Sequence, residues 1–170
     1  MLGDWSEVVA IVGTLARDIE VEDVSMATVR LESDAMLSVV NSVLSPREES
    51  YLRFDLTDAT VELRHLYGYG NENWTWTPAP HVDDVSRVAA WAPTSERRSG
   101  HVAQLTHVLE ALRDGVRPPS SGADARRTLE LITGIYRSAT TGRPVRCADL
   151  TADNPSYSSL TGEQVLEAQR

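Results

Sequence analysis

Four histidines and two tryptophans are the residues of this chain whose types and spacing could serve chemistry. His81 stands just before Asp83 and Asp84, and these nitrogen and oxygen atoms could bind a metal ion. A solvated polar loop explains the same residues better. His101 and His107 are six residues apart, whereas a zinc pair on a helix needs the spacing i, i+4. We therefore predict no metal site.

Trp74 and Trp76 are two residues apart, so on a strand both rings would lie on one face. On a covered face they would be core, and on an open face a subunit interface or a platform for stacking a sugar. His101, in the first turn of an expected helix, either bonds the local backbone or faces a pocket. The candidate substrate-facing or interface residues are thus Trp74, Trp76 and His101.

No set of residues assembles a catalytic site by itself. Gly68-Tyr69-Gly70 begins like a dinucleotide fingerprint, but Asn73 occupies the third glycine position and a strand pattern follows where a helix is required. All 16 cationic residues are arginine, so Schiff-base chemistry and a P-loop lysine are excluded for this chain. We expect no catalytic residue and no cofactor bound by the chain alone.

Composition narrows the class of protein. A length of 170 residues fits one domain, and we expect a single unit over residues 1–150 with a poorly anchored tail over residues 151–170. With Cys147 alone no intrachain disulfide can form, and neither a signal peptide nor an apolar run of membrane-spanning length is visible. A net charge of −9 repels phosphate backbones. We expect a soluble cytoplasmic protein that binds neither membrane nor nucleic acid.

The elements change in type half-way along the chain. The first half carries β-branched residues, alternation and turn signals, which predict strands. The expected strands cover residues 6–17, 24–31, 36–44, 51–56, 60–66 and 73–77, with hairpins joining 24–31 to 36–44 and 51–56 to 60–66.

The second half has helical periodicity. One helix is expected from Gly100 to Arg113 with Ser99 as N-cap and Gly115 beyond its end, its apolar stripe being Val102, Leu105, Val108, Leu109 and Leu112. A second begins at a capping box of Ser121 and Asp124 and ends at Gly142, its inward residues being Leu129, Ile132, Tyr136 and Ala139. Strands followed by helices predict an α+β fold, an open, mostly antiparallel sheet with helices packed on one face.

Four segments in order carry a resemblance to a known family: SGHVAQL at 99–105, LEALRDGVRPP at 109–119, GADARRTLEL at 122–131 and IYRSATTGRPV at 135–145. Together they are similar to the closing part of the Gfo/Idh/MocA family of NAD(P)-dependent oxidoreductases. The resemblance implies a C-terminal domain without the N-terminal Rossmann domain and its catalytic lysine. It also implies NAD or NADP as cofactor of the full-length family member.

The resemblance implies a function as well. The domain would shape the site for a sugar, cyclitol or similar polyol and would associate into a homo-oligomer, a dimer, through the open face of its sheet. It would not be redox-active alone. The alternative is a free-standing α+β module for dimerisation or small-ligand binding.

Overall fold

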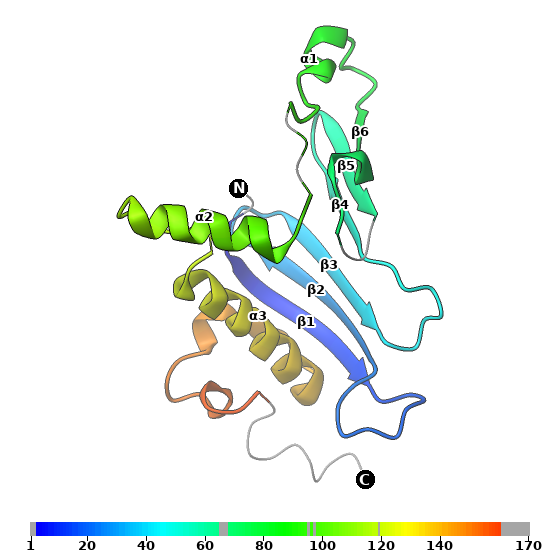
Figure 1. The fold of residues 1–170 in the computed structure, drawn as a ribbon. Coiled ribbons are helices and arrows are strands. Elements are labelled where there is room, and N and C mark those ends of the chain that lie inside the picture. Colours follow the sequence, from blue (N-terminus) through cyan, green and yellow to red (C-terminus); the bar gives the residue numbers. More distant parts are fainter. Residues whose placement is uncertain (1–2, 65–67, 95, 97, 119, 161–170) are drawn as a thin grey trace. The chain divides into compact units, whose positions relative to one another are not determined.

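The computed structural model describes residues 3–64, 68–94, 96, 98–118 and 120–160. They gather into two compact units, the first formed by Met1–Ser45 with Ser120–Arg170 and the second by Pro46–Pro119. Every strand pairing described is antiparallel, and helices accompany the strands (Figure 1). The predicted α+β class is confirmed, while one domain over residues 1–150 and a loose tail stay predictions.

The first unit is a sheet with one helix packed on it. Its strands, in the order β3-β2-β1-β7, are Met36–Ser42, Val24–Leu31, Trp5–Gly13 and Val145–Arg146. Helix α3, Gly122–Thr141, lies along β1 (Figure 1). The 3₁₀ turns η2, Cys147–Asp149, and η3, Pro155–Tyr157, follow. The hairpin of β2 and β3 is confirmed, whereas β1 ends at Gly13, short of the predicted residue 17.

Asp23 ends β1 by holding the loop that follows it. Its carboxylate accepts the backbone N–H groups of Leu15, Ala16 and Arg17 at 2.7, 2.9 and 3.0 Å. Burial by itself would raise the pKa of Asp23, but these hydrogen bonds favour the ionised form and together hold the pKa below its ordinary value. The loop between β1 and β2 is thus built around a buried carboxylate.

Small residues of α3 make the contact with the sheet. A Cβ atom on Gly134 would lie 2.9 Å from Trp5 Cη2 and 3.0 Å from Val8 Cγ1, so the glycine permits close packing. The buried Ser138 hydroxyl accepts the Ala10 N–H at 3.0 Å and donates to the Arg143 carbonyl at 2.8 Å. The core of the first unit comprises Trp5, Val8, Ala10, Ala27, Val29, Leu31 and Val145.

The inward face predicted for α3 is partly wrong. Leu131, Ile135 and Ala139 pack against the core, whereas Leu129 is exposed. The reason is that Gly134 and Ser138 set the line of closest approach, and a hydrophobicity pattern gives small and polar residues no weight. The predicted capping box is confirmed, since Asp124 Oδ2 accepts the backbone N–H of Ser121 at 2.8 Å.

The described residues of the second unit form a three-stranded sheet and two helices. Its strands, in the order β4-β5-β6, are Tyr51–Asp55, Ala59–Arg64 and Trp74–Pro78. The 3₁₀ turn η1, Asn71–Asn73, precedes β6, and helices α1, Val85–Ala89, and α2, His101–Arg113, come after it. The hairpin of β4 and β5 is confirmed. Helix α1 was missed because five residues are too few to show a period.

Helix α2 begins one residue later than predicted. Gly100, not Ser99, is the N-cap, and the backbone N–H of Ser99 instead donates to the Tyr69 carbonyl at 2.7 Å. Gly115 lies just beyond the helix end, as predicted. Its φ is +67°, a conformation that glycine adopts without strain.

Candidate functional site

The sheet of the first unit has one face packed by α3 and one open face. Alternation in β1 and β2 sends Val8, Ala10 and Val29 toward α3 and sends their neighbours the other way. The register aligns Ile11, Met26 and Val40 in one row of the open face. They are 75%, 54% and 64% exposed. An apolar row this open is a candidate association surface.

Polar residues border that apolar row. Val9 lies beside Thr28 and Ser38 in the next row, and the row beyond contains Glu7 and Arg30 together with the exposed Met36. Glu7 pairs with Arg146 of β7 at 3.5 Å. Apolar residues at the centre and charges at the edge are the usual composition of a protein–protein interface.

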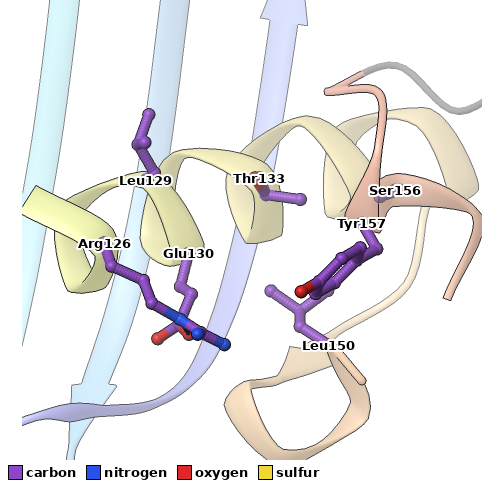
Figure 2. Close-up of a pocket in the computed structure, with 7 residues that line it drawn as sticks. All are labelled: Arg126, Leu129, Glu130, Thr133, Leu150, Ser156 and Tyr157. Atoms are coloured by element: carbon purple, nitrogen blue, oxygen red, sulfur yellow. Dashed lines mark hydrogen bonds and ion pairs between the residues drawn. The ribbon is translucent and has the colours of Figure 1, made fainter. Parts of the chain in front are cut away.

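A shallow cavity of about 340 Å³ lies on another side of α3 (Figure 2). Its lining is Arg126, Leu129, Glu130 and Thr133 of α3 together with Leu150, Ser156 and Tyr157. Arg126 Nε donates to Glu130 Oε1 at 2.9 Å, so the two charges neutralise each other. The cavity suits a small neutral ligand and holds no group arranged for catalysis. Sequence reasoning missed it because η3 was expected to be part of a loose tail.

The sheet of the second unit brings Trp74 and Trp76 together on one face. The register sets Trp74 opposite Leu63 and Trp76 opposite Val61, so all four side chains share that face. The two indole rings are stacked, with centroids 6.1 Å apart, and Tyr69 meets Trp74 edge-on at 6.4 Å. Both tryptophans are half-buried, and Leu63 is buried. The indole pair is therefore partly core and partly surface.

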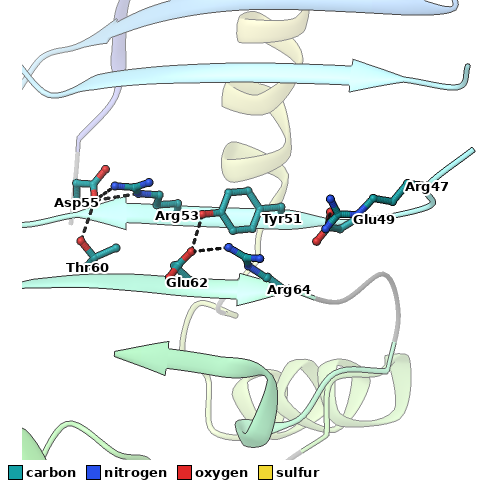
Figure 3. A network of polar contacts seen from close by, with 8 residues as sticks. All are labelled: Arg47, Glu49, Tyr51, Arg53, Asp55, Thr60, Glu62 and Arg64. Carbon is teal, nitrogen blue, oxygen red and sulfur yellow. Dashed lines mark hydrogen bonds and ion pairs between the residues drawn. The ribbon is translucent and has the colours of Figure 1, made fainter. Parts of the chain in front are cut away.

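The opposite face of this sheet carries a polar network (Figure 3). Glu62 Oε1 accepts from Tyr51 Oη at 2.7 Å and from Arg64 Nη2 at 3.1 Å, and Arg64 stacks 4.9 Å above the Tyr51 ring. These two hydrogen bonds, the one from Tyr51 first, lower the pKa of Glu62. Asp55 accepts from Arg53 and Thr60 at 3.0 and 2.9 Å, which lowers its pKa likewise. These acids and bases pair with each other, so the network offers no free charge to a ligand.

His101 stands apart from the indole pair. It is exposed at the first position of α2, and no hydrogen bond or ring contact of the described residues joins it to Trp74 or Trp76. His81 Nε2 lies 3.2 Å from Asp58 Oδ1, at the turn between β4 and β5. The glycine motif leads from Gly70 into η1 and then β6, not into a helix. The roles of Trp74, Trp76 and His101 stay predictions.

The described part of the chain contains no group of three His, Cys, Asp or Glu side chains placed to hold a metal ion. None of its helices has the length and apolar character needed to cross a membrane. His65 lies outside the described residues.

Known proteins resemble this chain over most of its length. No family model matches it. D-apiose dehydrogenase from Paraburkholderia graminis is 27% identical over 179 residues, which is 97% of this chain and 45% of that protein. The crystal structure of WlbA dehydrogenase from Bordetella pertussis, in complex with NADH and UDP-GlcNAcA, is 28% identical with a TM-score of 0.65, covering 85% of this chain and 41% of that one.

This chain resembles the C-terminal part of Gfo/Idh/MocA-like oxidoreductases. The resemblance of residues 99–145 is thereby confirmed. Aldose-aldose oxidoreductase from Caulobacter crescentus, at 22% identity, shares the fold with a TM-score of 0.62 over 85% of this chain and 42% of its own. The chain spans less than half the length of each of these relatives. The comparisons thus relate this chain to part of oxidoreductases that include sugar-related dehydrogenases.

Proposed function

We propose that this chain is the substrate-shaping and subunit-associating domain of an NAD(P)-dependent oxidoreductase that acts on a sugar, cyclitol or similar polyol. The relatives support the substrate class, since one is a D-apiose dehydrogenase and another was crystallised with NADH and UDP-GlcNAcA. The cofactor would be bound by the part of the longer protein that the match leaves uncovered. The chain alone would then bind neither NAD(H) nor NADP(H), because Gly68 and Gly70 lead into a strand.

One part of the proposal can be tested on this chain alone. It is that the chain forms a homodimer through the open face of the first unit's sheet. The observation that supports it is the exposed row Ile11, Met26 and Val40 with its polar border. The face is made of strands whose other side is fixed by α3, so it is rigid and self-complementary association costs little ordering.

Molar mass in solution tests this association. We expect the chain to be dimeric at micromolar concentration, and Met26→Glu to shift it to monomer by placing a charge in the apolar row. Asn41→Glu is the matched control, because Asn41 is exposed on the neighbouring strand β3 but lies on the other face. A clean monomer at high micromolar concentration, or equal effects of both variants, would rule out the open face as the interface.

Trp74 and Trp76 are proposed to border the substrate site or an interface of the complete enzyme, and His101 to face substrate. These roles are tested by measuring kcat and KM of the complete enzyme and comparing them with those of its Trp76→Leu and His101→Gln variants. A KM that rises while kcat is unchanged would fit a substrate-facing residue. Unchanged kinetics in both variants would remove them from the site.

The cavity beside α3 is the observation that supports the alternative, a free-standing small-ligand module. The coding sequence distinguishes the two functions. An in-frame region that encodes a Rossmann domain supports the oxidoreductase, and a reading frame without one supports the module.

A further inference from the structure

A second cavity lies at the end of α3 and shares no lining residue with the cavity described above. Its volume is about 610 Å³. The lining, called here the arginine pocket, comprises Arg137 and Thr141 of α3, residues 143–145 and, from the segment after β7, Asp149 and Asn154. All of these residues belong to the first unit, so that unit forms the pocket by itself.

Two guanidinium groups of the arginine pocket have no counter-charge. Neither Arg137 nor Arg143 makes an ion pair or a hydrogen bond through its guanidinium group to another of the described residues. The nearby Arg146, in contrast, pairs with Glu7 at 3.5 Å. Arg137 is half-buried, and a cation that has lost part of its hydration is stabilised by an anion beside it.

The backbone that carries both arginines is fixed. Arg137 and Thr141 are four positions apart on α3 and lie on one side of it, and Thr141 Oγ1 donates to the Arg137 carbonyl at 2.7 Å. After the helix, Gly142 turns the chain with φ of +63°, and Ser138 Oγ donates to the Arg143 carbonyl at 2.8 Å. Binding at this pocket therefore costs little ordering of the main chain.

Asn154 fixes the part of the arginine pocket that follows β7. Its Nδ2 donates to the Asp149 carbonyl at 2.8 Å, and its Oδ1 accepts the Ser156 N–H at 3.0 Å. These bonds hold the segment between η2 and η3. Asp149 also brings one negative charge to the lining, so two arginines against one aspartate leave one positive charge.

We infer that the arginine pocket binds a small carboxylate, whose oxygens accept hydrogen bonds from the guanidinium groups of Arg137 and Arg143. A guanidinium presents a planar fork of N–H donors that matches the two oxygens of a carboxylate. One negative charge balances the pocket, whereas a phosphate group at neutral pH carries more than one and would be repelled by Asp149. This inference goes beyond the proposed function and does not rest on it.

Isothermal titration calorimetry of the 170-residue chain at fixed ionic strength tests the site. The probe is D-gluconate, and sorbitol is the matched neutral control because it has a CH₂OH group in place of the carboxylate. We expect saturable binding of gluconate, weaker binding of inorganic phosphate and no binding of sorbitol. Arg137→Gln and Arg143→Gln should each weaken gluconate binding about ten-fold, which is the loss of one hydrogen bond between charged groups.

Arg146→Gln is the matched control variant, because Arg146 is exposed and does not line the pocket. Thermal melts show whether each variant is folded. Arg143 is exposed, so its replacement removes a charge without disturbing the core. Asp149→Asn should strengthen phosphate binding more than gluconate binding, since the lining would then carry two positive charges.

Several results would overturn the inference. Gluconate that does not bind saturably removes the site, and a loss in Arg146→Gln as large as in the two pocket variants removes its location. Sorbitol bound as tightly as gluconate would mean that the carboxylate is not recognised. Phosphate bound more tightly than gluconate by the parent chain would refute the carboxylate as the ligand.

Discussion

The two sheets of this chain use their faces in opposite ways. In the first unit the covered face is apolar and lies under α3, and the open face is apolar as well along Ile11, Met26 and Val40. In the second unit one face is a network of paired charges and the other carries Trp74 and Trp76. A face whose charges are paired with each other can remain exposed to water. An exposed apolar face, in contrast, is stabilised when a partner covers it. The comparison therefore favours the first unit's open face as the surface for the proposed association.

The largest contrast is expected between two tryptophans. Trp5 is only 5% exposed beneath α3, whereas Trp76 is half-buried on its sheet. Trp5→Ala should lower the free energy of unfolding by about 3–5 kcal/mol, the usual cost of removing a buried aromatic ring. Trp76→Ala should lower it by about 1–2 kcal/mol, because less apolar area leaves water on folding. Urea denaturation followed by circular dichroism measures both, and equal losses would contradict the contrast.

Gly134 tests how closely α3 lies on its sheet. Gly134→Ala gains about 1 kcal/mol of helix propensity but forces a Cβ against Trp5 and Val8, an overpacking that costs about 1–3 kcal/mol. We expect a net loss of about 1 kcal/mol in the free energy of unfolding. Gly122→Ala, at the first position of the same helix, is the control, since its Cβ would meet no atom within 4 Å. A Gly134→Ala protein more stable than the parent would show that the contact is loose.

We expect the smallest effects on stability from substitutions that compare a buried carboxylate, Asp23, with one in the exposed network, Glu62. The folded pKa of Asp23 lies below its unfolded value of about 3.9, so its contribution to stability is present above that pH and is lost as pH falls through the folded pKa. Asp23→Asn should therefore lower Tm by about 5 °C at pH 7, with the difference vanishing in strong acid. Glu62→Gln, in the exposed network, should change Tm by less than about 2 °C.

Thermal melts at pH 7 and at pH 2 measure these differences. A Tm of Asp23→Asn equal to that of the parent at pH 7 would mean that the loop between β1 and β2 holds without its carboxylate. A loss from Glu62→Gln as large as that from Asp23→Asn would mean that the polar face also depends on its charges.

Much of the architecture could be read from local signals. Alternation located the hairpins of β2 with β3 and β4 with β5, and the box of Ser121 and Asp124 located the start of α3. These features depend on neighbours within a few residues of one another, which a sequence displays directly.

The features that could not be read join residues far apart in the chain. The inward line of α3 depends on Trp5 and Val8 meeting Gly134, more than 120 positions away, and the cavity beside α3 depends on Tyr157 returning to Leu129 and Thr133. A hydrophobicity pattern assigned Leu129 to the core because it cannot show which side of a helix a distant glycine brings closest.

The sequence by itself determined the α+β class, the resemblance carried by residues 99–145 and the apolar spacing of α2. Only the tertiary structure decided which apolar residues are covered. Ala111 and Leu112 are neighbours on one helix, yet the first is buried and the second exposed. Periodicity measures how apolar a face is, whereas burial depends on which surfaces the folded chain brings against it.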